Sequence, residues 1–176
     1  MQFREVYDAH FAFVWRSLRR LGIPETGVQD AAQDVFLVVY RKLAEFEERS
    51  KLTTWLFRIC LRVAKDYRRR AHVRREVLDD AGIASSTDLQ ADTARGAERS
   101  EDLALFERAL GGVDLDQRAV FILFEIEGMT GDAIAETLGI PLGTVYSRLR
   151  LAREAFKRSV LRQSVLRAPH PRGSVA

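Results

Sequence analysis

The sequence predicts an all-α fold in which two small helical domains are joined by a flexible acidic linker. Glycine and proline are scarce, at 11 and 4 of 176 residues, so long stretches lack the turn residues that an all-β sandwich needs. Apolar residues recur every three or four positions, which is typical of amphipathic helices. The length leaves room for one ordinary domain or for two small ones around separate cores, and it excludes a large multidomain enzyme.

The first domain is expected over residues 1–72. Residues 2–21 carry regularly spaced apolar side chains and are followed by a Gly-Ile-Pro turn, which predicts a first helix. A second helix is expected at about residues 26–43. After a short polar loop, Thr53 or Thr54 could cap a third helix. Three amphipathic helices of this size can bury a common core.

The second domain is expected over residues 101–160, after a polar linker at 73–100. Two helices are expected first. One ends at Gly111-Gly112, and the other runs from Asp116 to Gly128. A short helix at residues 130–138, a Gly-Ile-Pro turn and a long helix from 142 to about 157 then predict a helix-turn-helix. Residues 161–176 are expected to form a disordered tail.

The second helix of this motif begins with small and polar side chains that suit the major groove of DNA. A helix-turn-helix can also be pure packing, because many helical bundles contain such a pair. The polar face and the trailing basic residues favour DNA binding over that alternative. The candidate residues are Gly143, Thr144, Tyr146, Ser147, Arg148, Arg150 and Arg153.

Basic and acidic residues are segregated along a chain whose net charge is only +3. A basic block at residues 58–75 and another at 148–172 flank an acidic stretch at 76–102. Within the first block, basic residues at helical spacing form a stripe opposite the apolar face, which is either a solvated surface or a nucleic-acid contact. The stripe consists of Arg58, Arg62, Lys65 and Arg69.

The sequence contains no pattern that predicts catalysis, a cofactor or a metal site. There is no glycine-rich phosphate loop and no nucleophile beside a histidine, and the three histidines are widely separated. Cys60 is the single cysteine and is expected to be a small buried residue. Without a secretory segment or an apolar run long enough to span a bilayer, we expect a cytoplasmic protein.

Three segments resemble bacterial RNA polymerase sigma factors of the extracytoplasmic-function type. They are 30–40 (DAAQDVFLVVY), 54–60 (TWLFRIC) and 143–149 (GTVYSRL), and they stand in the family's order. The resemblance covers about residues 6–70 and 103–158. It implies a non-enzymatic factor that binds core RNA polymerase and promoter DNA and is controlled by an anti-sigma factor. It also implies a place at the bacterial nucleoid, or near the inner membrane when the anti-sigma factor holds it there.

The resemblance also implies roles for individual residues. The first domain would dock on the clamp helices of the largest polymerase subunit through Asp30, Gln33, Asp34, Phe36 and Arg41. It would open the duplex and read the minus-ten element. The loop from Phe46 to Lys51, with Arg49 and Ser50, would hold a flipped base, and the basic stripe would follow the melted strand. The second domain would read the minus-thirty-five element through its helix-turn-helix.

Two positions depart from the family pattern. Tyr146 stands where many relatives have a basic residue, and Gly131-Asp132 replaces a commoner aromatic-acid pair. The alternative function is an autonomous helix-turn-helix regulator that binds duplex DNA without polymerase, for which we identify no dimer surface.

Overall fold

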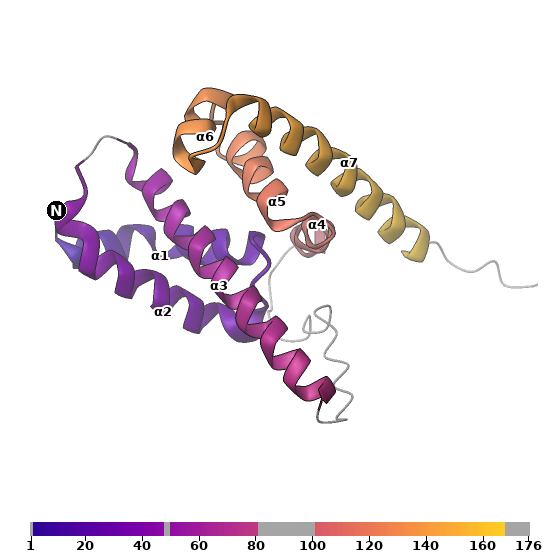
Figure 1. Cartoon of the computed structure of the whole chain (residues 1–176), viewed down its shortest axis with the longest axis horizontal. Helices are drawn as coiled ribbons and strands as arrows, with labels where there is room; N and C mark the ends of the chain where they lie inside the picture. The colour runs from indigo at the N-terminus through magenta and orange to yellow at the C-terminus, as the bar shows by residue number, and fades with distance from the viewer. Residues whose placement is uncertain (1, 48–49, 81–100, 168–176) are drawn as a thin grey trace, which may run out of the picture.

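The computed structural model describes residues 2–47, 50–80 and 101–167, and this part of the chain is helical (Figure 1). It contains no strand, so the predicted all-α class is confirmed. The elements are α1 (Phe3–Arg20), α2 (Glu25–Lys42), the 3-10 turn η1 (Leu43–Glu45), α3 (Leu52–Asp80), α4 (Glu101–Gly111), α5 (Leu115–Phe121), the π-helical turn η2 (Ile122–Ile126), α6 (Gly131–Leu138) and α7 (Leu142–Arg167).

The N-terminal helices, α1 to α3, pack against one another in all three pairs. Each helix turns an apolar stripe inward, and Leu18, Val35 and Cys60 are fully buried where the stripes meet. The chain leaves α1 through Gly22, whose φ of 95° is a conformation that only glycine adopts without strain. The three-helix core expected from the apolar periodicity is therefore present.

The C-terminal helices, α4 to α7, are organised around α7, which contacts α4, α5 and α6. Helices α6 and α7 form the predicted helix-turn-helix. The Thr130 hydroxyl caps α6 by accepting a hydrogen bond from the Ala133 amide at 3.3 Å. Gly139 ends α6 in the left-handed conformation, with φ 64° and ψ 39°. Both ends of α6 are thus set by local residue preferences.

Two helices have bounds that differ from those predicted. Helix α3 begins at Leu52, so Thr53 and Thr54 lie inside its first turn and neither is its cap. It also continues to Asp80, well past the boundary expected near His72, and α7 continues to Arg167 through the start of the expected tail. Neither helix contains a proline or an interior glycine beyond its first turn, so nothing in the backbone stops it where its apolar stripe ends.

The expected linker from residue 81 onward and the expected tail from residue 168 onward lie outside the described residues.

The two groups of helices pack against each other. Helix α1 contacts α4 and α3 contacts α6, as Figure 1 shows for α6 beside the upper part of α3. A single cluster of buried apolar residues extends through both groups. Phe57 and Leu61 of α3 belong to it, although the sequence analysis did not place them on the inner face. The separate cores considered from the sequence are thus one continuous core in this conformation.

Candidate nucleic-acid and partner interfaces

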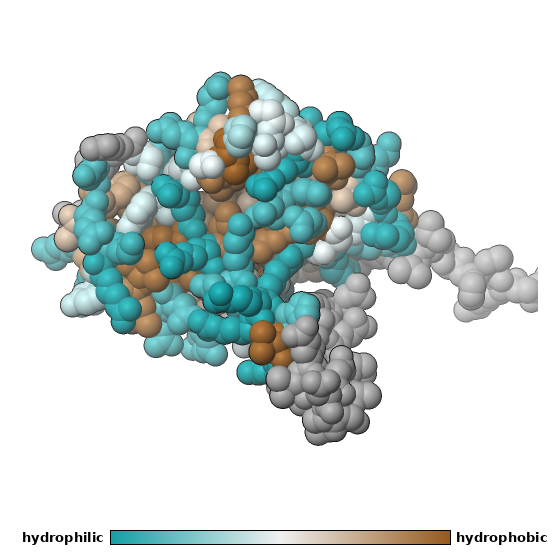
Figure 2. All heavy atoms as spheres, in the orientation of Figure 1, coloured by the Kyte–Doolittle hydropathy of each residue, from teal (hydrophilic) through white to brown (hydrophobic). Residues whose placement is uncertain are grey.

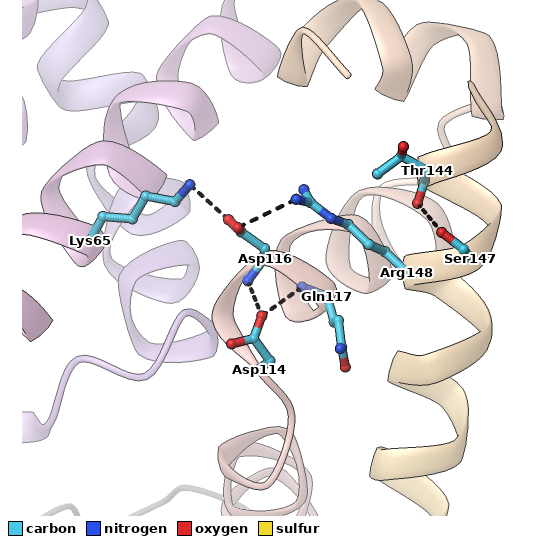
Figure 3. Close-up of polar contacts among 7 residues, drawn as sticks. All are labelled: Lys65, Asp114, Asp116, Gln117, Thr144, Ser147 and Arg148. Atoms are coloured by element: carbon cyan, nitrogen blue, oxygen red, sulfur yellow. Dashed lines mark hydrogen bonds and ion pairs between the residues drawn. The ribbon is translucent and has the colours of Figure 1, made fainter. Parts of the chain in front are cut away.

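The first turns of α7 present the polar surface expected for a recognition helix. Gly143, Tyr146 and Ser147 are exposed, and Thr144 is half-buried. The Ser147 hydroxyl donates to the Thr144 carbonyl at 3.0 Å, which fixes its direction (Figure 3). Tyr146 lies over the start of α6, where a Cβ at Gly131 would come within 2.8 Å of the tyrosine hydroxyl. The Gly131 and Tyr146 departures are therefore spatially coupled, because the small residue makes room for the ring.

Every arginine proposed on α7 is held by a carboxylate. Arg148 Nη2 lies 3.5 Å from Asp116 Oδ2, and Arg150 Nη1 lies 2.8 Å from Glu154 Oε1. Arg153 pairs with Glu125, Nη2 to Oε1, at 2.6 Å and also lies over the Phe124 ring. In this conformation the ion pairs set the direction of each guanidinium above the helix, and guanidinium groups suit the base edges of a major groove.

The basic stripe of α3 is exposed, and in the view of Figure 2 mostly hydrophilic residues lie where α3 passes in front of α1 and α2. Among the described residues, Arg58 and Arg62 form no ion pair. Lys65 Nζ lies 2.7 Å from Asp116 Oδ1, and Arg69 pairs with Asp66 at 3.1 Å. The first two arginines are thus available to phosphates, while Lys65 is already engaged by the C-terminal helices.

The loop before α3 begins at an aromatic pair. Phe46 ends η1 and its ring lies 5.2 Å from that of Trp55, at an angle of 45°. Both side chains are half-buried, while Ser50 and Lys51 are exposed. Arg49 lies outside the described residues. The rings meet at the root of the loop, and aromatic residues that are only partly buried can stack on bases.

The proposed docking residues of α2 fall into two groups. Asp30, Gln33 and Arg41 are exposed, and half-buried Asp34 forms an ion pair with Arg70 of α3 at 3.7 Å. Phe36 is only 4% exposed, so it supports this surface from beneath. Its ring packs in a cluster of aromatic side chains from α1 and α2. The cluster borders an apolar groove of about 510 Å³ lined chiefly by Phe3, Tyr7, Phe11, Trp15, Phe36, Leu37 and Tyr40.

Ion pairs that the sequence analysis missed join the N-terminal and C-terminal helices. Asp116, in the first turn of α5, binds Lys65 of α3 and Arg148 of α7 through its two oxygens (Figure 3). At the other end, Arg19 of α1 binds Glu107 of α4 at 3.1 Å. No sequence signal marks such pairs, because the partners are far apart in the chain and each is an ordinary surface residue by itself.

Arg118 is a second residue that sequence reasoning missed. It is 1% exposed, and its guanidinium donates to the Val113 carbonyl at 2.8 Å and the Gly111 carbonyl at 3.0 Å. Burial, and then the nearby Arg68, lower the pKa of Arg118 to about 9, which still leaves it charged at neutral pH. A Cβ at Gly22 would overlap its Nη1 atom, so Arg118 fills the space beside the first interhelical turn. Its position directly before the apolar run at residues 119–124 was the one available signal.

Chemically reactive groups do not gather in the described residues. Cys60 is fully buried, and burial raises the pKa of its thiol, as expected for a structural residue. Within residues 2–47, 50–80 and 101–167, no three His, Cys, Asp or Glu side chains are placed to hold a metal ion. In the same part of the chain, no helix combines the length and apolarity that crossing a membrane requires.

Comparison with known proteins gives matches along both groups of helices. Residues 6–74 match the family model described as sigma-70 region 2, and residues 103–156 match sigma-70 region 4. The sigma factor NccH of Alcaligenes xylosoxydans is 32% identical over 86% of this chain and 82% of its own length. The extracytoplasmic-function sigma-E factor of Escherichia coli is 32% identical over 78% and 76%.

Two solved structures resemble the whole arrangement. The sigma factor RpoE of Bartonella quintana, in complex with the anti-sigma factor NepR, matches with a TM-score of 0.70 and 26% identity over 91% of this chain and 96% of that one. CnrH, in complex with the cytosolic domain of CnrY, matches with a TM-score of 0.58 and 29% identity over 92% and 88%. CnrH occurs in Cupriavidus metallidurans.

Proposed function

The chain belongs to the extracytoplasmic-function group of sigma-70 type RNA polymerase sigma factors, and from that premise we propose how its surfaces divide the work of initiation. The factor binds core RNA polymerase and directs it to promoters. The N-terminal helices read and open the minus-ten element, and the C-terminal helices read the minus-thirty-five element as duplex. The observation that carries this division is a contrast between the two helices. Arg58 and Arg62 of α3 form no ion pair among the described residues, whereas Arg148, Arg150 and Arg153 of α7 each pair with a carboxylate.

Melted DNA and duplex DNA need different protein surfaces. Single strands are bound by cations that follow the phosphates and by aromatic faces that stack on bases. Helix α3 and the Phe46–Trp55 pair offer both, with Arg69, Ser50, Lys51 and, by the family pattern, Arg49 alongside. Duplex sequence is read by donors held at fixed positions in the major groove. Helix α7 supplies donors through Thr144 and the proposed arginines. The Ser147 hydroxyl, which donates to the Thr144 carbonyl, adds an acceptor, and Gly143 and Tyr146 lie on the same surface.

Polymerase docking is assigned to the outer face of α2. Asp30, Gln33, Asp34 and Arg41 form a polar surface supported by buried Phe36, and the clamp helices of the largest polymerase subunit are its proposed partner. The Asp34→Arg variant tests this assignment. It replaces an attractive contact with repulsion of Arg70, but the pair is exposed enough that the free energy of unfolding should fall by less than about 1 kcal/mol.

The measurement is a pull-down with core polymerase, accompanied by thermal unfolding. We expect Asp34→Arg to lose polymerase binding while remaining folded. Asp8→Arg is the control. It reverses a charge on the exposed surface of α1 and places an arginine beside Arg4, the ion-pair partner of Asp8, so it should bind polymerase normally. Wild-type binding by Asp34→Arg would contradict the assignment.

Control by an anti-sigma factor is the second part of the proposal. Both solved relatives are complexes with such proteins. In this chain, the apolar groove between α1 and α2 is of a size that would accept apolar side chains of a partner helix. Gln33 and Phe36 line the groove and belong to the proposed polymerase surface. An anti-sigma segment in the groove would therefore compete directly with polymerase.

Runoff transcription with purified core polymerase on a library of candidate promoters tests the function as a whole. Promoter-dependent transcripts that require the protein are expected. An autonomous helix-turn-helix regulator would instead bind duplex DNA without polymerase and yield no such transcripts. Because the reaction chemistry belongs to the polymerase, the isolated chain should show no catalytic turnover. Its proposed place of action is the cytoplasm, at the nucleoid or near an anti-sigma factor held at the membrane.

A further inference from the structure

The start of the recognition helix carries a small apolar patch. Tyr146 and Leu142, one turn apart on α7, are 52% and 38% exposed. Both side chains lie over buried Gly131 at the start of α6, since a Cβ there would come within 2.8 Å of the Tyr146 hydroxyl and 3.1 Å of Leu142 Cδ1. Helix α6 packs against the first part of α7 (Figure 1). Glycine at position 131 therefore lets the tyrosine ring rest on α6.

The orientation of the Tyr146 ring decides which of its atoms a ligand can meet. Its hydroxyl and Cζ are the atoms nearest to the position that a Cβ at Gly131 would take. The polar tip of the side chain is therefore turned toward α6, and the carbon edge of the ring faces a ligand that approaches α7. Gly143, one turn before Tyr146, has open space where a side chain would stand. A base edge in the groove can thus reach the ring from that side.

The cation closest in helical spacing is turned away from the ring. Arg150 lies one turn beyond Tyr146 and is held in the opposite direction by Glu154, with 2.8 Å between Nη1 and Oε1. In the major groove, guanine is read by arginine or lysine, whereas thymine presents a methyl group that apolar side chains contact. An uncharged ring beside a leucine suits the thymine methyl group.

We propose that Tyr146 reads a thymine methyl group in the minus-thirty-five duplex, and that Gly131 is the positioning residue that makes this contact possible. The assignment rests on the proposed function, because it names the base that the helix-turn-helix recognises at one position. Any side chain at position 131 displaces the ring from α6. Residue 131 therefore influences the choice of base without touching DNA.

The first experiment selects duplexes with randomised sequence by binding to the full-length chain. Wild type should enrich a thymine at one position, and Tyr146→Ala should lose that preference. Replacing this thymine by deoxyuridine removes only the methyl group, so it should weaken binding by wild type about fourfold, the effect of burying one methyl group. Tyr146→Phe keeps the ring and should keep the fourfold effect, whereas Tyr146→Ala should bind both duplexes equally. An equal uracil effect in wild type and Tyr146→Ala would overturn the proposal.

Gly131→Ala tests the positioning role. The added Cβ meets only side-chain atoms of exposed Tyr146 and Leu142, and alanine is favoured over glycine within a helix, so the ring should move while the fold is retained. We expect thermal unfolding like that of wild type and a uracil effect below about twofold. Gly111→Ala is the matched control, because Gly111 is exposed at the end of α4 with open space around it, and it should keep the fourfold effect.

A double variant separates positioning from a general change of α6. In the Tyr146→Ala background, Gly131→Ala should cause no further change in base preference, because the ring that it displaces is absent. A fourfold uracil effect that survives Gly131→Ala would refute the role of Gly131. A change of base preference by Gly131→Ala that does not require Tyr146 would refute it as well.

Runoff transcription with core polymerase is measured on the same thymine and uracil duplexes. A Tyr146-dependent uracil effect on binding without any transcripts would refute the proposed function but support the methyl contact. Transcripts without that effect would support the function and refute the contact. Enrichment of guanine at the position that depends on Tyr146, or of no base at all, would also refute the contact. Loss of polymerase binding by Tyr146→Ala with unchanged base preference would assign the patch to a protein partner instead.

Discussion

The basic surfaces of α3 and α7 look alike in the sequence but differ in the structure. Both helices carry arginines at helical spacing. On α7 the arginines Arg148, Arg150 and Arg153 are each held by a carboxylate, whereas on α3 Arg58 and Arg62 have no acidic partner among the described residues. Charge density alone therefore does not define a DNA-binding mode. Fixed cations suit base readout in a groove, and adaptable ones suit a flexible strand.

The largest expected effect is on duplex recognition by α7. Arg150→Ala should weaken binding to the minus-thirty-five duplex by about 1 to 3 kcal/mol and relax sequence preference at one position, because a positioned arginine is replaced by a side chain without donors. Binding to a promoter library measures both. Arg158→Ala removes the same charge from an exposed position further along α7 and should cause only a small, sequence-independent loss. Equal effects of the two variants would mean that Arg150 does not read a base, and that α7 binds DNA through its charge alone, as proposed for α3.

The packing between the N-terminal and C-terminal helices is tested next. Gly22→Ala should lower the free energy of unfolding by about 1 to 2 kcal/mol, because alanine is strained at the positive φ of this position. The overlap of its Cβ with Arg118 should lower the free energy of unfolding further. Gly128→Ala is a close control, since Gly128 also has positive φ but has open space around the position of a Cβ. Denaturant unfolding measures both variants. A loss for Gly22→Ala no greater than for Gly128→Ala would show that Arg118 does not tie the two groups together.

The smallest effect is expected on α3. Arg62→Gln should reduce the salt dependence of minus-ten single-strand binding by about 0.7 in the slope of log K against log salt, without changing sequence preference. Arg16→Gln, an exposed arginine of α1 outside the stripe, should leave the slope unchanged. Fluorescence titrations at several salt concentrations give the slopes. A change of sequence preference in Arg62→Gln would mean that α3, too, reads bases through a fixed arginine.

Much of the local structure was predictable because its causes lie within a few residues. The Thr130 cap and the left-handed Gly139 follow from side-chain and backbone preferences that do not depend on distant contacts. The ends of α3 and α7 were not predictable from apolar periodicity. That pattern reports where a helix is packed, and both helices continue beyond their packed region because no proline or glycine interrupts them.

The sequence by itself determined the helical class, the helix-turn-helix and the family, since all three are carried by residue spacing along the chain. Only the tertiary structure decided which charged residues are free. Lys65, Asp116 and Arg148 come from three helices and are brought together by packing, so no local pattern could show that one carboxylate serves both basic surfaces. Ion pairs depend on separation in space, and that separation is fixed only once the apolar stripes of the helices have been buried.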